Sequence, residues 1–301
     1  MRLLAPGTRL ADGLEVIAHL ARSDAVDVYD AWSDLRGCRV AVRALRPDRL
    51  HDGEARAALL REGGLLAHLT HPHLLRAYEV HEGHRPLVVL APLRGTTLAA
   101  LLAAERPRRV AEAARLGLQA GSALRYINGQ GVVHLDVRPS GVLLADGGAQ
   151  LIDLAIARRP GLVEPGLGSR GYLSPEQARG EFAGPAADVW GLGAVLYEAL
   201  AGVPPFGHDA HACLERRAEP LRRHRPRAPR ALAGAVEAAL EPDALARPEI
   251  EELLAVLDAH AGHPAGPDRW WLGEPSSNGS SARDGRGRTA RARSTHPRAG
   301  R

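Results

Sequence analysis

The chain has 301 residues, 45% of them hydrophobic, and a formal net charge of +4 at pH 7, so it can bury a sizeable core and is not a disordered protein. Its two cysteines, Cys38 and Cys213, are far apart, which disfavours a disulfide framework or a zinc site. No apolar run of 18 residues and no signal peptide follow Met1, so the sequence predicts no transmembrane segment and a cytoplasmic location.

The 39 basic residues are all arginine, because the chain contains no lysine. Such a composition is typical of proteins from GC-rich bacterial genomes. Residues 263–301 carry eight arginines against three acidic residues, whereas residues 1–262 are close to neutral. The basic charge therefore does not predict a nucleic-acid-binding fold.

Three valine-rich runs, LEVIAHL, VDVYDAW and RVAVRAL, lie within residues 12–50 and are separated by turn residues. Each has the length of a strand, so they predict an antiparallel sheet. Residues 53–69 have leucines at helical spacing, and Gly63 and Gly64 should soften that helix at roughly 1 kcal/mol each. A further strand pair, LLRAYEV and RPLVVLA, completes the first lobe near Pro92.

After Gly95 the hydrophobic spacing is mainly helical, and it continues so to about residue 262. From His263 onward proline, glycine, serine and arginine replace this periodicity, which predicts disorder. The expected organisation is a sheet-rich lobe at residues 1–93, a helical lobe at 94–262 and a disordered basic tail at 263–301.

Four motifs follow one another along the chain: VAVR at 40–43, HLDVRPSG at 134–141, IDLA at 152–155 and SPE at 174–176. In this order they resemble the eukaryotic-like serine/threonine protein kinase family. The resemblance implies an α+β, two-lobed protein-kinase fold, with a small antiparallel β lobe carrying one helix and a larger, mainly α lobe. It also implies ATP and Mg²⁺ as cofactors and a protein as the substrate.

In HLDVRPSG the resemblance makes Asp136 the catalytic base for the substrate hydroxyl. Leu135 replaces an arginine that reads phosphorylation of the activation segment, so this switch is not expected. Arg138 replaces a lysine that steadies the transferring phosphate. Gly141 replaces a magnesium-binding asparagine, so one metal ligand is missing.

Asp153 resembles the magnesium ligand of the family's Asp-Phe-Gly motif, with Leu154 as its apolar plug. Arg43 stands where the family has a lysine that binds the ATP phosphates and pairs with a helix glutamate, here Glu62. An arginine can keep this ion pair but cannot replace the compact ammonium at a phosphate site. The alternatives are a capped turn for Asp153 and a solvent-facing strand position for Arg43.

Ahead of this strand the family places three glycines whose backbone N–H groups hold the phosphates. Here Ala21, Ser23 and Val26 occupy those positions. Asp24 should repel the phosphates, unless Arg22 compensates its charge. The phosphate site therefore departs furthest from the family.

The adenine site is better preserved, because apolar residues stand at each of its positions. The resemblance places adenine between Val28, Ala41 and Leu143 and beside a hinge that contains Ala91 and Leu93.

The scaffold motifs are also recognisable, with Ser169 in the place of the family's threonine. Glu176 in SPE should form an ion pair with Arg247, and Asp188 should support the catalytic loop. Ser169 stands in the expected substrate platform.

These substitutions favour a pseudokinase that acts through a protein partner and binds nucleotide weakly and with little or no metal. The alternative is a slow but genuine serine/threonine kinase that uses Asp136 and Asp153. A third hypothesis is nucleic-acid binding by the tail, which is disfavoured because the tail has no aromatic residue after Trp271 for base stacking.

Overall fold

The computed structural model describes residues 3–104, 107–145, 148–207, 209 and 212–262. These residues all fall within one compact unit, Met1–Trp271. The tail predicted at residues 263–301 lies outside the described residues.

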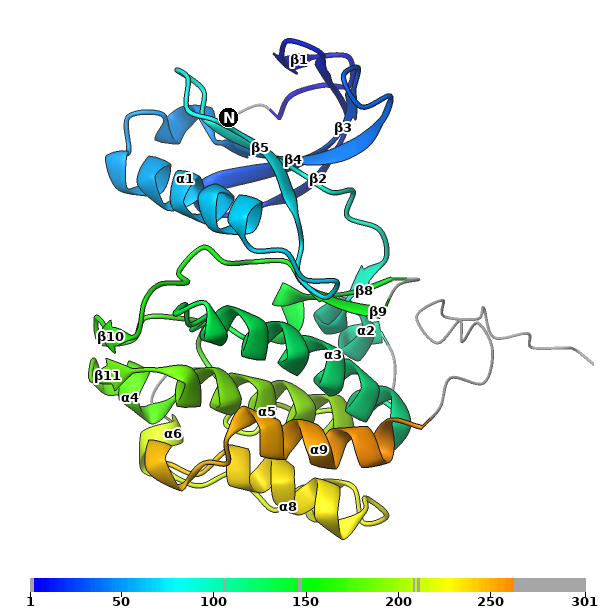
Figure 1. Cartoon of the computed structure of the whole chain (residues 1–301), viewed down its shortest axis with the longest axis vertical. Coiled ribbons are helices and arrows are strands. Elements are labelled where there is room, and N and C mark those ends of the chain that lie inside the picture. Colours follow the sequence, from blue (N-terminus) through cyan, green and yellow to red (C-terminus); the bar gives the residue numbers. More distant parts are fainter. Residues whose placement is uncertain (1–2, 105–106, 146–147, 208, 210–211, 263–301) are drawn as a thin grey trace, which may run out of the picture. The chain divides into compact units, whose positions relative to one another are not determined.

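A six-stranded antiparallel sheet forms the first part of the chain (Figure 1). The strands lie in the order β1-β2-β3-β4-β6-β5. Their bounds are β1 (Arg9–Ala11), β2 (Leu14–Arg22), β3 (Val26–Ser33), β4 (Cys38–Leu45), β5 (Ala77–His81) and β6 (Leu87–Leu90). The three valine-rich runs fall on β2, β3 and β4, so these strand predictions are confirmed.

Successive side chains of β4 point to opposite faces of the sheet. Val40 and Val42 are fully buried in a small apolar cluster on one face. Ala41 belongs to the larger core on the other face, and Arg43 follows it on that side. This alternation places Arg43 toward the rest of the chain.

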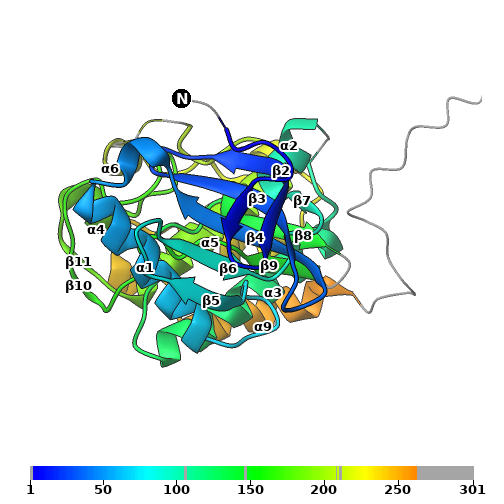
Figure 2. The same ribbon diagram turned by 90° about the horizontal axis from the view of Figure 1, so that it is seen from above.

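Helix α1 (Gly53–His68) lies beside β5 and β6 (Figure 2). Its N-cap, Asp52, accepts a hydrogen bond from the N–H of Ala55 at 3.0 Å. The helix continues through Gly63 and Gly64 without a break. A Cβ at Gly63 would lie 2.6 Å from Cγ2 of Val88, whereas a Cβ at Gly64 would meet nothing within 4 Å. Gly63 therefore allows the close approach of α1 to the sheet.

We expect different effects from alanine at these two adjacent positions. Gly64→Ala should raise the free energy of unfolding by roughly 0.5–1 kcal/mol, because alanine restricts the unfolded chain and favours a helix. Gly63→Ala should give no gain or lower the free energy of unfolding, because its methyl group meets Val88. Urea unfolding of the two variants checks this, and equal gains would contradict the packing of α1.

The second part of the chain is mainly helical, as predicted. Its helices are α2 (Leu98–Ala104), α3 (Val110–Gly129), α4 (Pro175–Arg179), α5 (Pro185–Ala201), α6 (Ala212–Glu215), α7 (Leu221–His224), α8 (Arg230–Ala239) and α9 (Ile250–Ala261). Short strands complete it: β7 (Thr96–Thr97), β8 (Val142–Ala145), β9 (Gly148–Leu151), β10 (Gly161–Leu162) and β11 (Phe182–Ala183). Helix α3 packs against α5 and α9. The lobe boundary after residue 93 stays a prediction.

A buried ion pair joins α4 to the segment before α9, as expected. The Nη1 and Nη2 atoms of Arg247 each lie 2.7 Å from one carboxylate oxygen of Glu176. The guanidinium also lies 4.9 Å from the ring centroid of Trp190. None of the helices within the described ranges is both long and apolar enough to span a bilayer.

Candidate active site

A cavity of about 800 Å³ opens between the sheet, α1 and the loops on either side of β8 and β9. It brings together residues from distant parts of the sequence. Six residues predicted for the site line it: Val28, Arg43, Glu62, Asp136, Arg138 and Asp153.

Arg43 crosses from β4 to α1 and to the segment after β9. Its Nη1 forms an ion pair with Glu62, and its Nη2 donates to the carbonyl of Ile152 at 2.8 Å. Glu62 also accepts the N–H of Leu154 at 3.0 Å. Burial raises the pKa of Glu62, and the charge of Arg43 opposes this rise. With 13% of its side chain exposed, Arg43 is not a solvent-facing strand residue.

Arg138 lies between the two carboxylates that the resemblance assigns to catalysis. Its Nε donates to Oδ2 of Asp136 at 2.8 Å, and its Nη2 donates to Oδ2 of Asp153 at 3.2 Å. It also donates to the hydroxyl of Ser140. One guanidinium therefore contacts both carboxylates at once.

Asp153 is held between two guanidinium groups. Besides Arg138 on Oδ2, Nη1 of Arg43 lies 3.7 Å from Oδ1, and the N–H of Ala155 donates to Oδ1 at 3.1 Å. Burial alone would raise the pKa of Asp153, but Arg43, this N–H and Arg138 lower it below the usual value. Asp153 is therefore ionised, and both of its oxygens are already engaged.

The neighbouring residues do not fit a magnesium ion, because Asp153 is engaged on both oxygens and Gly141 provides no side-chain oxygen. Gly141 nevertheless has room for a side chain. A Cβ there would lie 3.9 Å from Cγ of Arg138 and 3.9 Å from the carbonyl oxygen of Asp136. A Cβ at this position would therefore make only ordinary van der Waals contacts.

Asp136 keeps one oxygen free. Its Oδ1 is buried and has no hydrogen-bond partner among the described residues, while Oδ2 is bound by Arg138. A carboxylate oxygen in this state can still accept a proton from a substrate hydroxyl.

The loop that carries Asp136 is fixed from below by Asp188, as predicted. The buried carboxylate of Asp188 accepts the N–H groups of His134 at 2.9 Å and Leu135 at 2.8 Å. These bonds hold Leu135 at φ +64°, a conformation that costs roughly 1–2 kcal/mol for a residue with a Cβ. The Leu135 side chain packs with Val163 in an apolar cluster, so apolar contacts fill the place of the phosphate-reading arginine.

The segment expected to bind phosphates is a tight hairpin between β2 and β3. The N–H of Ser23 donates to the carbonyl of Val26 at 2.8 Å, and the N–H of Val26 donates to Oγ of Ser23 at 3.1 Å. Nη1 of Arg46 binds the carbonyls of Ser23 at 3.1 Å and Asp24 at 3.2 Å. Two N–H groups that a phosphate cradle would present are therefore used within the hairpin.

Arg22 does not compensate Asp24, so the exception allowed for in the sequence analysis does not apply. Its Nε and Nη2 bind the two oxygens of Asp27 at 2.7 and 2.9 Å, because Asp27 faces Arg22 across the β2–β3 pairing. Asp24 lines the cavity. The acidic lining residues are Asp24, Asp52, Glu54, Glu62, Asp136 and Asp153, and the basic ones are Arg43, Arg49 and Arg138.

Asp27 should make the stability of the protein depend on acid pH. It is buried, and the hydrogen bond from Arg22 lowers its pKa below the usual value against the opposing effect of burial. Near pH 4 the unfolded chain therefore binds more protons at this residue than the folded chain does. The contribution of ionised Asp27 to the free energy of unfolding is complete above that pH and is lost as the pH falls further. In thermal unfolding from pH 6 to about pH 3, we expect a smaller loss for Asp27→Asn. The matched control is Asp12→Asn, at an exposed carboxylate. If Asp27→Asn loses as much thermal stability between these pH values as the wild type, Asp27 is not the group responsible.

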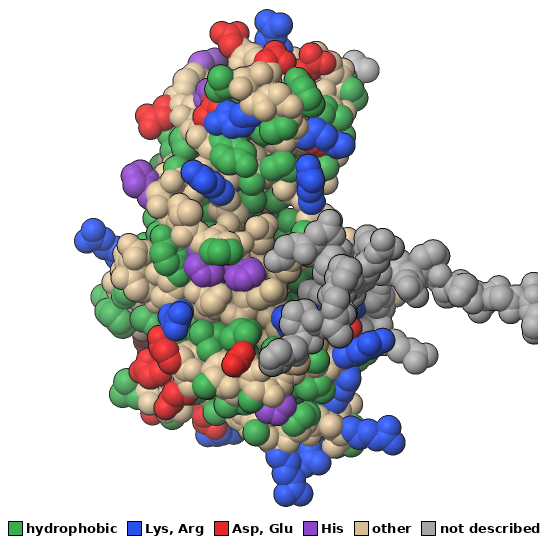
Figure 3. Space-filling model, turned by 45° about the vertical axis from the view of Figure 1, so that its right-hand side comes forward, with side chains coloured by type: hydrophobic (Ala, Val, Ile, Leu, Met, Phe, Trp, Pro, Cys, Tyr) green, Lys and Arg blue, Asp and Glu red, His purple; other side chains and the backbone are tan. Residues whose placement is uncertain are grey.

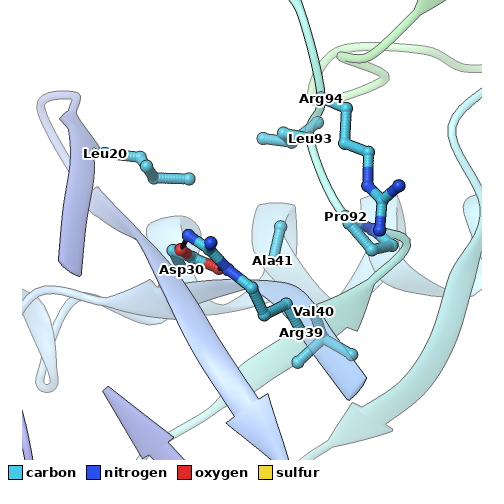
Figure 4. A pocket seen from close by; sticks show the side chains of 8 residues that line it. All are labelled: Leu20, Asp30, Arg39, Val40, Ala41, Pro92, Leu93 and Arg94. Carbon is cyan, nitrogen blue, oxygen red and sulfur yellow. Dashed lines mark hydrogen bonds and ion pairs between the residues drawn. The ribbon is translucent and has the colours of Figure 1, made fainter. Parts of the chain in front are cut away.

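The predicted adenine site lies at the other end of the same sheet face. A pocket of about 270 Å³ is lined there by Leu20, Ala41, Pro92 and Leu93 (Figure 4). Leu143 and Ala41 share one buried cluster, against which Ala91 and Leu93 pack; Val28 lines the larger cavity instead. The N–H of Ala91 is bound to a carbonyl, so Ala91 can offer a ligand only its own carbonyl.

Figure 4 also shows an ion pair in the lining of this pocket that the sequence analysis missed. Asp30 on β3 forms an ion pair with Arg39 on β4, diagonally across the two strands, because the register places Asp30 opposite Ala41. A signal was available, because Asp30 is two residues after Val28 and Arg39 is two residues before Ala41. The period of two puts all four on one face.

A third hollow of about 430 Å³ lies on the opposite side of Arg138. It is lined by Ser140, Ser169, Tyr172 and Glu198, among others. The hydroxyl of Tyr172 donates to Oε2 of Glu198 at 2.5 Å. Arg138 lines both this hollow and the larger cavity, so it separates the candidate nucleotide and acceptor sites.

Residues 15–256 match the family model described as the protein kinase domain. A probable serine/threonine-protein kinase of Streptomyces coelicolor is 34% identical over 218 residues, which are 67% of this chain and 32% of that protein. Serine/threonine-protein kinase PknB of Mycobacterium tuberculosis is 34% identical over 193 residues, which are 59% of this chain and 30% of PknB. The matched region thus spans about a third of these relatives.

The crystal structure of the Mycobacterium tuberculosis PknI kinase domain superposes with a TM-score of 0.69 at 25% identity, covering 86% of this chain and 100% of that one. A point mutant of the same domain gives a TM-score of 0.70. The small antiparallel sheet with one helix and the larger helical part are common to both folds.

Proposed function

Since the chain belongs to the protein kinase family, whose members transfer phosphate from ATP with Mg²⁺ to protein substrates, we propose that it is a catalytically impaired member. In this proposal it is a pseudokinase that acts by binding a partner protein through its helical lobe, residues 94–262. Adenine would lie among Val28, Ala41, Ala91, Leu93 and Leu143, and nucleotide would bind weakly.

The position of Arg138 supports this proposal most strongly. Its guanidinium contacts both Asp136 and Asp153, and Arg43 approaches Asp153 from the other side. A metal ion could reach Asp153 only by displacing charge-assisted contacts, which are the stronger class of hydrogen bond. The site is therefore organised around arginine rather than around magnesium.

The charge of the cavity supports the same conclusion. Six carboxylates face three guanidinium groups along its lining, so a triphosphate without a bound cation would be repelled. The Ser23–Val26 hairpin uses internally two of the N–H groups that would otherwise bind phosphate oxygens. The adenine pocket has no such excess of carboxylates, because the one acidic residue of its lining, Asp30, is paired with Arg39. We therefore expect the base to supply most of the nucleotide affinity.

The experiment that tests the proposal is a long phosphotransfer assay with radiolabelled ATP, Mg²⁺ and generic protein acceptors. Active kinases turn over roughly 1 to 100 times per second, and each lost electrostatic contact costs about a hundred- to a thousand-fold. We expect turnover below about one per hour. Rapid Mg²⁺-dependent phosphorylation that Asp136→Asn abolishes would contradict the proposal.

A slow serine/threonine kinase is the second candidate, and the free Oδ1 of Asp136 favours it. With Asp153 ionised nearby, a weakly bound metal would retain one protein ligand. This candidate predicts slow transfer that Asp136→Asn and Asp153→Ala both abolish while thermal unfolding stays cooperative. Transfer that survives both substitutions would exclude it.

A further inference from the structure

A cluster of arginines covers one corner of the helical lobe. Residues 216–230 hold seven of the chain's 39 basic residues and a single acidic residue, Glu219. The basic corner consists of five arginines on α7, the following turn and the first residue of α8: Arg222, Arg223, Arg225, Arg227 and Arg230. Four of them are exposed and Arg225 is half-buried. Basic side chains gather toward the lower end of the face seen in Figure 3.

The backbone beneath the basic corner is well anchored. Leu221 and Ala228 are buried in the main core, and the N–H of Leu221 donates to Glu237 at 2.8 Å. Prolines at positions 220, 226 and 229 further restrict the backbone. A partner would therefore meet arginines on an ordered surface, which lowers the entropy cost of binding.

The charges of the basic corner are poorly compensated within the fold. Arg223 lies 3.7 Å from Glu219, but both side chains are exposed, so this pair contributes little. Arg222, Arg227 and Arg230 form no ion pair with any other described residue. Arg230 is the first residue of α8, where the helix dipole disfavours a cation. The cluster therefore weakens rather than supports local stability, and an anionic partner would offset that cost.

The surrounding residues indicate the chemistry of this partner. No large aliphatic side chain and no Phe, Trp or Tyr is exposed between residues 216 and 230, so the corner has no apolar wedge for a membrane. Its exposed aromatic ring, His224, lies edge-on to Tyr197. Guanidinium groups bind carboxylates with paired hydrogen bonds. Nearby, Nη1 of Arg217 binds the two oxygens of Glu241 at 2.6 and 2.8 Å.

We propose that the basic corner is a docking surface for an acidic segment, rich in aspartate or glutamate, of a partner protein. This inference deepens the proposed function, on which it rests, by naming the surface and the chemistry of the partner. It involves neither nucleotide nor phosphate transfer, so the two can fail separately. An active kinase could dock acidic proteins here, and a pseudokinase could bind its partner elsewhere.

The test measures binding of a fluorescent, glutamate-rich peptide of about twelve residues to the full chain at low salt by anisotropy. The variant Arg222→Glu/Arg227→Glu/Arg230→Glu reverses the three unpaired charges. Its control, Arg61→Glu/Arg76→Glu/Arg85→Glu, makes the same change of charge at exposed arginines elsewhere. Both variants retain all arginines of residues 263–301, and thermal unfolding verifies that both fold.

We expect the corner variant to bind the peptide at least about tenfold more weakly, and the control less than about twofold more weakly. Equal weakening in both variants would show a response to net charge alone and would overturn the proposal. The proposal is also overturned if the wild-type chain binds duplex DNA or phosphatidylserine vesicles through this corner but does not bind the peptide. Binding to none of the three would overturn it as well.

Discussion

Mg²⁺-dependent ATP binding should appear when three residues of the cavity are changed together, in the variant Arg43→Lys/Arg138→Lys/Gly141→Asn. The shorter lysines would release Asp153 from the guanidinium groups that now hold it, and the asparagine amide would supply a second oxygen ligand. A Cβ at Gly141 would make only ordinary van der Waals contacts. One restored charge-assisted contact is worth about 1.5–3 kcal/mol, so ATP with Mg²⁺ should bind at least about tenfold more tightly than to the wild-type chain.

Calorimetric titration with and without Mg²⁺ measures this gain in ATP affinity. Two further variants test whether the gain depends on the added asparagine and on Asp153. Arg43→Lys/Arg138→Lys alone should gain less, because it lacks the added ligand. Adding Asp153→Ala to the triple variant should remove the gain. A triple variant that binds ATP no better than the wild type would show that the arginines do not limit binding.

Among the substitutions described, removal of Arg247 should lower the free energy of unfolding most. Arg247→Ala leaves Glu176 buried without its partner, and breaking a buried pair in this way costs about 3–5 kcal/mol. The substitution also removes two hydrogen bonds, because Arg247 donates to the carbonyls of Glu241 and Ala186 at 2.8 Å each. Urea unfolding should show the lower free energy of unfolding.

A double variant separates the isolated charge from the lost packing. Arg247→Met/Glu176→Leu removes both charges and keeps apolar volume, so it should recover part of the stability lost in Arg247→Ala. If Arg247→Ala costs less than about 1 kcal/mol, the pair is not the buried connection described above.

Much of the fold could be predicted because local patterns agree with tertiary packing. The valine-rich runs have the length of strands and are separated by turn residues, so β2, β3 and β4 were placed correctly. The expectation that Gly63 and Gly64 soften the helix was based on helix propensity alone. Contact with Val88 gives Gly63 a packing role, and such a contact between distant residues has no local sequence signal.

For the candidate site, the sequence predicted which residues belong to it but not the contacts between them. Motif order identified Arg43, Glu62, Asp136, Arg138 and Asp153, which all line one cavity. The sequence did not show that one guanidinium would bridge two carboxylates, because an arginine side chain is long and has several rotatable bonds.

Partner choice at the hairpin was missed for a related reason. Arg22 is closer in sequence to Asp24, but strand pairing puts Asp27 opposite Arg22. The basic corner was missed because summing charge over residues 1–262 hides a local excess that acidic residues elsewhere cancel.

The most direct test of the impaired site compares adenosine and ATP binding to the wild-type chain by calorimetry, each with and without Mg²⁺. We predict that ATP binds no more tightly than adenosine and that Mg²⁺ changes neither affinity, because the carboxylates are paired with arginine and the phosphate hairpin is closed. ATP binding that Mg²⁺ strengthens tenfold or more, by about 1.4 kcal/mol, would show a working phosphate site and contradict the account.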